Sequence, residues 1–170
     1  DPEEPTSQQL AYVKGLFESF EQALRANDWS ESTGYPKYID VDSFVDYYIV
    51  QELTKNIDGN LRKSSFITKE RGKKMEMYHL WDFDLTLGNC GYFWGSTGNG
   101  PENFWIKLDK WYPHLFNDPA FVEKVQDRWN ELMPEFEKIP DFIDDQVLSL
   151  DKAQKRNFEV WSIWESVDWV

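Results

Sequence analysis

Residues 56–84 read NIDGNLRKSSFITKERGKKMEMYHLWDFD and carry the clearest indication of how this chain folds. Residues 65–68 and 75–80 are rich in apolar, aromatic and β-branched residues, and the polar run 70–73 between them contains a glycine. This pattern predicts two strands joined by a short turn. A hairpin returns the chain near its starting point, so we expect the loop before the first strand and the segment after the second to be neighbours.

Two carboxylates fall at the breaks that flank this hairpin. Asp58 follows the end of a predicted helix, and Asp82 follows the second strand. Phosphoryl transfer needs divalent cations on the phosphates and a carboxylate that orients the attacking hydroxyl. Protein kinases place one Asp in a loop after a helix, and a metal-binding Asp-Phe pair after two strands. Asp58, then Asn60, then Ser64 or Ser65, then Asp82-Phe83 follow this order, although no His-Arg-Asp or Asp-Phe-Gly sequence occurs.

Each of these residues also has an ordinary structural explanation. The Asp-Gly pair at 58–59 is a common turn sequence. Asp82 and Asp84 share one face of an extended segment, where they can bind one cation or equally cap a turn. Glu52 and Asn56 lie four residues apart on the preceding helix, where they either support Asp58 or face solvent.

Helical periodicity is predicted on both sides of the hairpin. The first helix begins after a cap at Thr6 or Ser7, and the second after a cap at Asp40 or Asp42. We expect a loop over residues 27–37 and a Trp-rich tail, with Trp161, Trp164 and Trp169, that packs back on the body. The predicted helices cover residues 7–24, 43–55, 118–132 and 141–157. The expected fold class is therefore α+β, mainly helical, with a small hairpin beside the site.

Composition restricts the partners. The net charge is −13, from 18 basic and 31 acidic residues, so nucleic acid and anionic membranes are repelled. Basic proteins, cations and neutral glycans stay compatible with this charge. No apolar run approaches the ~20 residues that a membrane-spanning helix needs. The 29 aromatic residues (9 Trp, 8 Tyr, 12 Phe) are enough to form a hydrophobic core.

At these residues the chain resembles the CotH kinase-like family, atypical kinases first recognised through a spore-coat protein. Trp81-Asp82-Phe83-Asp84 with Gly88-Asn89 carries most of the likeness. Further matching stretches are 38–44, 51–58, the hairpin around 66–69, 117–121, 128–129 and 156–158, so the likeness spans most of residues 8–165.

The resemblance implies a kinase-like fold that binds ATP with Mg²⁺ or Mn²⁺ and phosphorylates protein hydroxyls. Asp58 would be the catalytic-loop aspartate, and Asp82, with Asp84, the metal site. Asn60 and Ser64 would contact the cofactor, although some members have Asn where this chain has Ser64. Glu52, Asn56 and Asn89 would support the site.

We further expect residues 1–170 to be a single domain, the C-terminal, kinase C-lobe-like portion of the family's domain, without the N-terminal lobe that clamps the nucleotide. Such a fragment would be inactive alone, because positioning supplies much of phosphoryl-transfer catalysis. The family's association with secreted and cell-surface proteins predicts an extracytoplasmic location.

Two other functions compete with the kinase hypothesis. A catalytically silent relative would act as a binding or surface-display module of a larger secreted protein. Glycan binding through exposed aromatic residues is the third possibility, and Trp94 and Trp105 in one groove would favour it. Binding of ATP with metal by the full-length protein separates the first hypothesis from the second.

Overall fold

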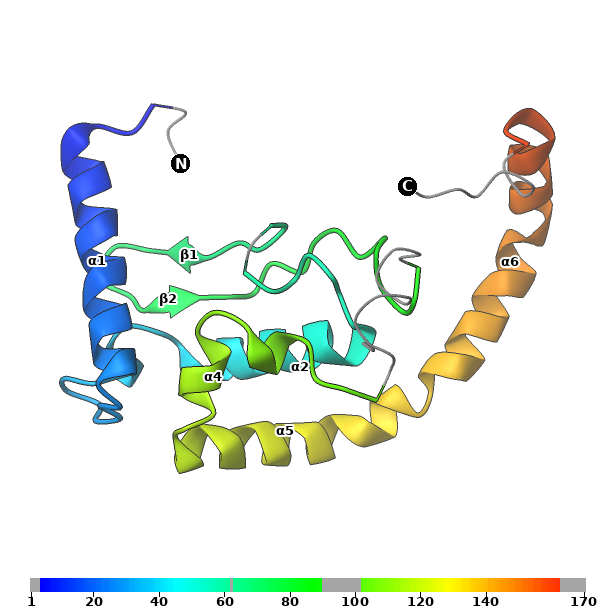
Figure 1. Cartoon of the computed structure of the whole chain (residues 1–170). Coiled ribbons are helices and arrows are strands. Elements are labelled where there is room, and N and C mark those ends of the chain that lie inside the picture. Colours follow the sequence, from blue (N-terminus) through cyan, green and yellow to red (C-terminus); the bar gives the residue numbers. More distant parts are fainter. Residues whose placement is uncertain (1–3, 62, 90–101, 163–170) are drawn as a thin grey trace.

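The computed structural model describes residues 4–61, 63–89 and 102–162. Helices joined by loops make up most of this part, with one small antiparallel sheet (Figure 1), so the predicted α+β, mainly helical class is confirmed. The elements are α1 (Ser7–Arg25), the 3-10 helix η1 (Tyr35–Lys37), α2 (Val41–Thr54), β1 (Thr68–Lys69), β2 (Met75–Glu76), the 3-10 helix η2 (Ile106–Leu108), α4 (Tyr112–Leu115), α5 (Pro119–Phe136) and α6 (Ile139–Val160).

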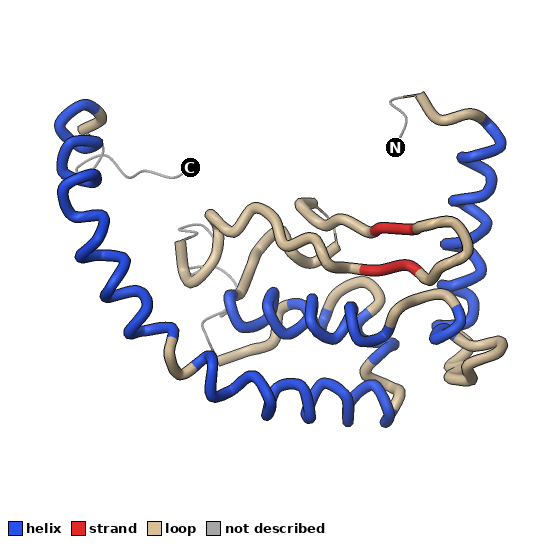
Figure 2. The backbone as a smooth tube through the Cα atoms, turned by 180° about the vertical axis from the view of Figure 1, so that it is seen from behind, coloured by secondary structure: helices blue, strands red, loops and turns tan. Residues whose placement is uncertain are grey.

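Helix α2 forms the centre of the fold, with the hairpin on one side and α5 on the other (Figure 2). The side chain of Asp40 accepts the backbone N–H of Ser43 at 2.9 Å and caps this helix. Of the two predicted caps, Asp40 and Asp42, the structure therefore uses Asp40. Phe44, Tyr47 and Ile49 are fully or almost fully buried. Burial on more than one side explains why the apolar residues of α2 do not form a single narrow stripe.

Helices α2 and α5 run in the same direction in a constant register. Lys124 pairs with Asp42 at 2.6 Å and Arg128 pairs with Asp46 at 2.7 Å, each across 82 residues. Helix α5 starts where the sequence predicts, with Asp118 as its cap and a proline in the first turn. This register fixes which residues of the two helices face each other.

The hairpin is tied to the start of α2. Thr68 pairs with Glu76 and Lys69 with Met75 in antiparallel register. Met75 also forms a parallel bridge with Ile39 on its other side, through backbone hydrogen bonds of 2.8 Å with Tyr38 and Asp40. The chain on both sides of the hairpin is thereby held close to α2.

Both strands are shorter than predicted. The predicted strands cover residues 65–68 and 75–80, but only two residues of each strand pair in the structure. The backbone N–H of Met77 donates to the hydroxyl of Ser43 at 3.1 Å in place of a strand partner. Residues 78–81 are exposed and lie outside the paired part of the hairpin. The apolar residues that predicted a strand there therefore extend beyond the last strand pair.

Only the second half of α1 packs on the body. The helix begins in a capping box made by Thr6 and Gln9, in agreement with one of the two predicted caps. Phe20 and Leu24 are buried, whereas Leu10 is 56% exposed. The predicted apolar face is therefore real, but the described residues cover only part of it.

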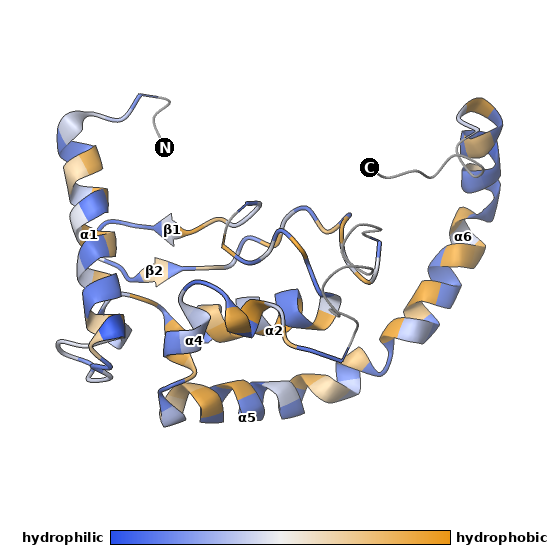
Figure 3. Ribbon diagram, in the orientation of Figure 1, coloured by the Kyte–Doolittle hydropathy of each residue, from blue (hydrophilic) through white to orange (hydrophobic). Residues whose placement is uncertain are grey.

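Helix α6 leaves the body altogether and rises beside it (Figure 3). The apolar residues that predicted this helix are exposed by 55% or more, because no other described element covers them: Phe142, Val147, Leu148 and Leu150. Trp161 is 65% exposed, so the predicted packing of the tail is wrong for this residue. Trp164 and Trp169 lie outside the described residues.

Three short elements were not predicted. Helix η1 lies within the expected loop 27–37, and η2 and α4 precede α5. Ile106, Tyr112 and Leu115 from η2 and α4 are fully buried, and the Tyr112 hydroxyl donates to the carbonyl of Phe44 at 3.1 Å. Elements of three or four residues are too short to show a helical period, which is why the pattern did not reveal them.

Candidate functional site

The first predicted site residue, Asp58, lies in a tight loop at the end of α2. Lys55 ends the helix in the left-handed conformation, with φ of 51°. Asn56 is fully buried, and its side-chain oxygen accepts the backbone N–H of Asp58 at 3.2 Å. This Asx turn replaces the next turn of the helix and directs the chain to Asp58.

Asn56 also joins this loop to the segment of Asp82. Its side-chain nitrogen donates to the carbonyl of Asp82 at 3.4 Å, across 26 residues. Backbone hydrogen bonds continue the pairing, from Leu87 to Thr54 at 2.8 Å and from Ile57 to Leu85 at 3.5 Å. The two loops therefore lie side by side, and Asn56 has hydrogen bonds to both. That both carboxylates face one cleft stays a prediction.

Asp82 is exposed and forms a hydrogen bond with another predicted site residue. The hydroxyl of Ser64 donates to its carboxylate at 2.8 Å. Both residues have positive φ, 42° for Ser64 and 65° for Asp82. Side chains other than glycine adopt this conformation at a cost of about 1–2 kcal/mol, least for Asp and Asn. The surrounding hydrogen bonds must offset this cost.

Asp84 and Asn89 lie in the turn that follows. The amide of Asn89 donates to the backbone carbonyl of Asp84 at 2.7 Å, so Asn89 holds the turn and not the carboxylate. Thr86 closes the same turn through the carbonyl of Phe83 at 2.7 Å. The Asp84 residue is exposed, as Asp82 is, and both carboxylates are accessible from solvent.

A divalent cation fits this donor set. Within residues 4–61, 63–89 and 102–162, no group of three His, Cys, Asp or Glu side chains is arranged to hold a metal. Mg²⁺ does not require such a group, because it is usually held by one or two carboxylates together with water and phosphate oxygens. The exposed carboxylates of Asp82 and Asp84 are groups of this kind, and the Ser64 hydroxyl binds one oxygen of Asp82.

Asn60 points inward, in contrast to its predicted role toward the cofactor. It is only 3% exposed, and its side-chain nitrogen donates to the carboxylate of Asp109 at 2.9 Å. Its side-chain oxygen is buried and has no partner among the described residues, and the amide of Gln51 is in the same position. The structure thus shows Asn60 in a contact that anchors the loop, which its position in sequence did not reveal.

Glu52 neither contacts Asp58 nor faces solvent. Its carboxylate accepts the backbone N–H groups of Trp105, Ile106 and Lys107 at 2.6–3.1 Å, and Lys55 pairs with it at 2.7 Å. Charge-assisted hydrogen bonds of this kind are about twice as strong as neutral ones. Glu52 therefore fixes the chain that leads into η2.

Two residues that sequence reasoning did not identify also support the Asp58 loop. The Tyr47 hydroxyl donates to the carbonyl of Gly59 at 2.9 Å. Burial raises the pKa of Tyr47, so the phenol stays protonated as a donor. A Cβ on Gly59 would lie 2.1 Å from the side-chain oxygen of Gln51, so a larger residue there would force the Gln51 side chain to move. Only the periodicity of α2 hinted that both residues face inward.

The prediction that Trp94 and Trp105 share one exposed groove can be followed only for Trp105. The indole N–H of Trp105 donates to the carbonyl of Ile57 at 3.3 Å, and its side chain is half-buried. Trp94 lies outside the described residues. Trp105 therefore serves the Asp58 loop directly. None of the described helices has an apolar stretch long enough to cross a bilayer.

Comparison with known protein families supplies the last observation. The sequence model of one family, described as CotH kinase protein, matches residues 1–169. No curated protein and no solved structure gave a significant match. The family match covers both loops of the candidate site and every described helix.

Proposed function

Because the chain belongs to the CotH kinase family, we propose that it forms the metal- and nucleotide-binding portion of an atypical protein kinase that transfers phosphate from ATP to protein hydroxyls. The contact of Asn56 with both loops carries this proposal. It holds the backbone of Asp58 and that of Asp82 at one position, as a reaction that depends on positioning requires.

In this proposal Asp58 accepts a hydrogen bond from the substrate hydroxyl and orients its oxygen toward the phosphate. The loop is suited to hold that carboxylate in place, because Asn56 binds the backbone N–H of Asp58 and Tyr47 binds the carbonyl of Gly59. A side chain that is positioned before substrate arrives loses less entropy during the reaction.

Asp82 and Asp84 would hold the divalent cation, which supplies charge neutralisation at the phosphates when bound. Ser64 keeps one oxygen of Asp82 oriented by its hydrogen bond. In this proposal Asn60 does not contact the cofactor directly. It anchors the Asp58 loop through its hydrogen bond to Asp109.

The competing proposal is a catalytically silent binding module. The observation that favours it is the Ser64 hydroxyl itself, since some family members have Asn at this position and Asn provides a carbonyl ligand. A silent module would keep the loop geometry and the Ser64–Asp82 contact without ATP-dependent transfer.

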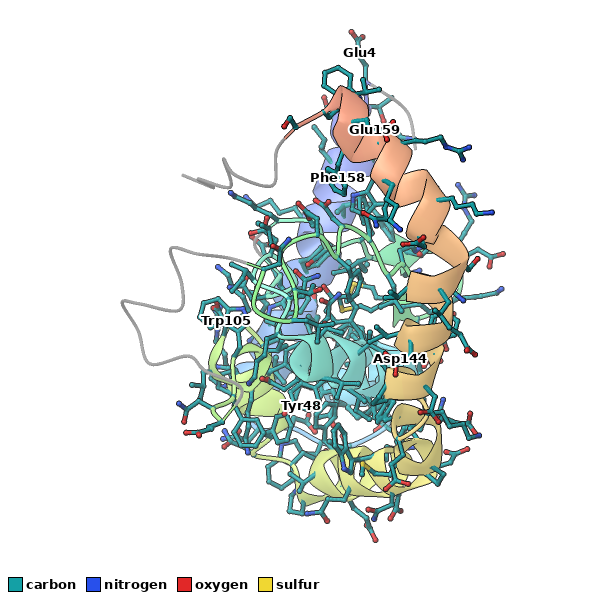
Figure 4. The ribbon with its side chains drawn as sticks, turned by 90° about the vertical axis from the view of Figure 1, so that its right-hand side faces the viewer. Glu4, Tyr48, Trp105, Asp144, Phe158 and Glu159 are labelled. Carbon is teal, nitrogen blue, oxygen red and sulfur yellow. The ribbon has the colours of Figure 1, made fainter. Side chains whose placement is uncertain are left out.

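Phosphotransfer by the full-length protein, with Mg²⁺ and radiolabelled ATP, tests the proposal. Asp58→Asn should lower kcat by about 100-fold or more, because a positioned acid–base group contributes about 10²–10⁴-fold. Asp144→Asn, an exposed α6 residue labelled in Figure 4, is the control and should transfer like wild type. Wild-type protein that neither binds Mg-ATP nor transfers phosphate would support the silent module.

A further inference from the structure

A cavity of about 700 Å³ lies between α2, α5 and residues 102–104, on the opposite side of α2 from the hairpin. Most of its lining is apolar and comes from Tyr48, Leu53, Phe104, Val125 and Trp129. Its volume is within the roughly 300–1,000 Å³ of ligand-binding pockets. Figure 4 shows Tyr48 at the level between α2 and α5.

Two aromatic residues of this cavity are accessible from solvent. Phe104 is 52% exposed and Trp129 is 36% exposed, although each also has a neighbour that orders it. Lys107 lies over the ring of Phe104 at 4.8 Å, and Trp129 packs on Phe136 with ring centroids 5.4 Å apart. Ordered aromatic side chains at a concave surface are typical of sites that bind a bulky apolar group.

The charge around the cavity indicates which kind of apolar group. Glu52 and Lys55 in its lining are paired with each other, Glu102 adds a negative charge, and Lys107 over the ring of Phe104 adds a positive one. A second hollow of about 420 Å³, also lined by residues of α2 and α5, contains four acidic and two basic residues. With a net charge of −13 on the chain, a cationic segment is attracted and an anionic one is repelled.

The cavity is physically joined to the Asp58 loop. Lys55 lines it, and only two residues separate Lys55 from Asp58, a span of about 10 Å at most between their Cα atoms. Trp105, next to the cavity wall at 102–104, donates to the carbonyl of Ile57 at 3.3 Å. A chain seated in the cavity therefore lies within a few residues of the proposed acceptor position.

We propose that this cavity binds a bulky apolar side chain of the protein substrate, flanked by Lys or Arg, and so brings the acceptor hydroxyl to Asp58. The inference rests on the proposed function, since it assigns the substrate class of that site. The contact acts on substrate binding and not on the nucleotide.

Binding of labelled peptides to the chain, measured by fluorescence anisotropy without nucleotide, tests the inference separately from catalysis. The probes are Lys-flanked peptides with one Ser and with Phe at successive positions on either side of it. Matched peptides carry Ala in place of Phe, or Glu in place of Lys. We expect Phe at one position to tighten binding at least about tenfold over Ala, and Glu to weaken it.

Two variants act on the cavity in opposite ways. Trp129→Ala removes an aromatic wall, and Gln126→Trp fills the space from an exposed position without removing core packing. Both should lose the preference for Phe. Trp161→Ala, at the exposed Trp directly after α6, is the matched control and should keep it.

The outcomes separate this inference from the proposed function. Equal binding of Phe and Ala peptides, or loss of the preference in Trp161→Ala as well, overturns the inference whether or not phosphate is transferred. Phe-dependent binding without transfer by the full-length protein supports the cavity and removes the kinase function. A dimer seen by light scattering that dissociates in Gln126→Trp would assign the cavity to a second copy and overturn the inference.

Discussion

The hydroxyl of Ser64 donates a hydrogen bond of 2.8 Å to the carboxylate of Asp82, across 18 residues. Both residues have a positive φ. Ser64 precedes the hairpin and Asp82 follows it, so this contact closes the two ends of the hairpin over the candidate site. It also leaves Asp82 with one oriented oxygen, which is the arrangement that a metal-binding carboxylate needs.

Ser64→Ala should therefore weaken Mg-ATP binding by the full-length protein about tenfold, as loss of an outer-shell partner usually does. Ser64→Gly should lose as much, although glycine suits the positive φ, because the hydroxyl is the active group. Titration with Mg-ATP measures both. Ser149→Ala on the exposed face of α6 is the control. Wild-type affinity in both variants would exclude a role for this hydroxyl.

Asn56→Ala should destabilise the fold by about 1–3 kcal/mol, because it leaves the N–H of Asp58 and the carbonyl of Asp82 without their partner in a partly buried place. Urea unfolding measures this change. The exposed residue Asn157 provides the control, since its replacement by Ala should change stability by less than about 0.5 kcal/mol. An Asn56 variant as stable as wild type would show that the bridge between the loops contributes nothing.

Glu52→Gln should cost about 3 kcal/mol, because it removes the charge that three backbone N–H groups and Lys55 share. Glutamine keeps the size of the side chain, so lost packing cannot explain the effect. Glu135→Gln, at an exposed ion pair, should change stability by less than about 1 kcal/mol. Thermal or urea unfolding of the two variants compares them directly, and equal losses would contradict the special role of Glu52.

Alkaline pH should unfold the protein. Burial raises the pKa of Tyr35, Tyr47, Tyr48 and Tyr112 above the ordinary value of 10.0. The folded state then holds protons that the unfolded state releases, so stability is full below about pH 10 and is lost as pH rises above it. Four such groups give a slope of up to about 5 kcal/mol per pH unit. Urea unfolding at about pH 9 and pH 11 measures the loss, and Tyr47→Phe should reduce the slope by about one quarter.

Much of the helical framework could be predicted, because it depends on local signals. Asp40 and Asp118 cap α2 and α5, each one of two neighbouring candidates in the sequence, and the apolar period marks both helices. The same local signals gave α6 correctly as a helix, but not its exposure, because hydrophobicity alone does not reveal whether another element covers a face.

The candidate site could be predicted only in part. The hairpin explains why the segments of Asp58 and Asp82 are neighbours, and Asn56 was identified as a supporting residue without its contacts. Asn60 and Glu52 could not be assigned from sequence, since their partners lie 49 and 53–55 residues away. Tertiary contacts over such separations leave no trace in local composition.

The last prediction concerns the charge of Asp82, and its design follows from the backbone conformation at that position. Asp82 has φ of 65°. Alanine there would cost about 1–2 kcal/mol from the backbone alone, whereas Asn tolerates the left-handed region and can still accept from Ser64. Asp82→Asn therefore removes the charge without the strain, and its stability should stay within about 0.5 kcal/mol of wild type.

If Asp82 holds the divalent cation, Asp82→Asn should abolish metal-dependent phosphotransfer by the full-length protein and lower its Mg-ATP affinity at least about tenfold, in a fold that melts like wild type. If Asp82 only completes a turn, Asn does this as well as Asp, and transfer is unchanged. Asp82→Ala reports the backbone cost separately. Thermal melts and Mg-ATP titrations of all three proteins, with and without Mg²⁺, measure both quantities. Normal turnover by folded Asp82→Asn would remove Asp82 from the metal site, since a neutral amide cannot replace the charge that Mg²⁺ requires of a carboxylate ligand.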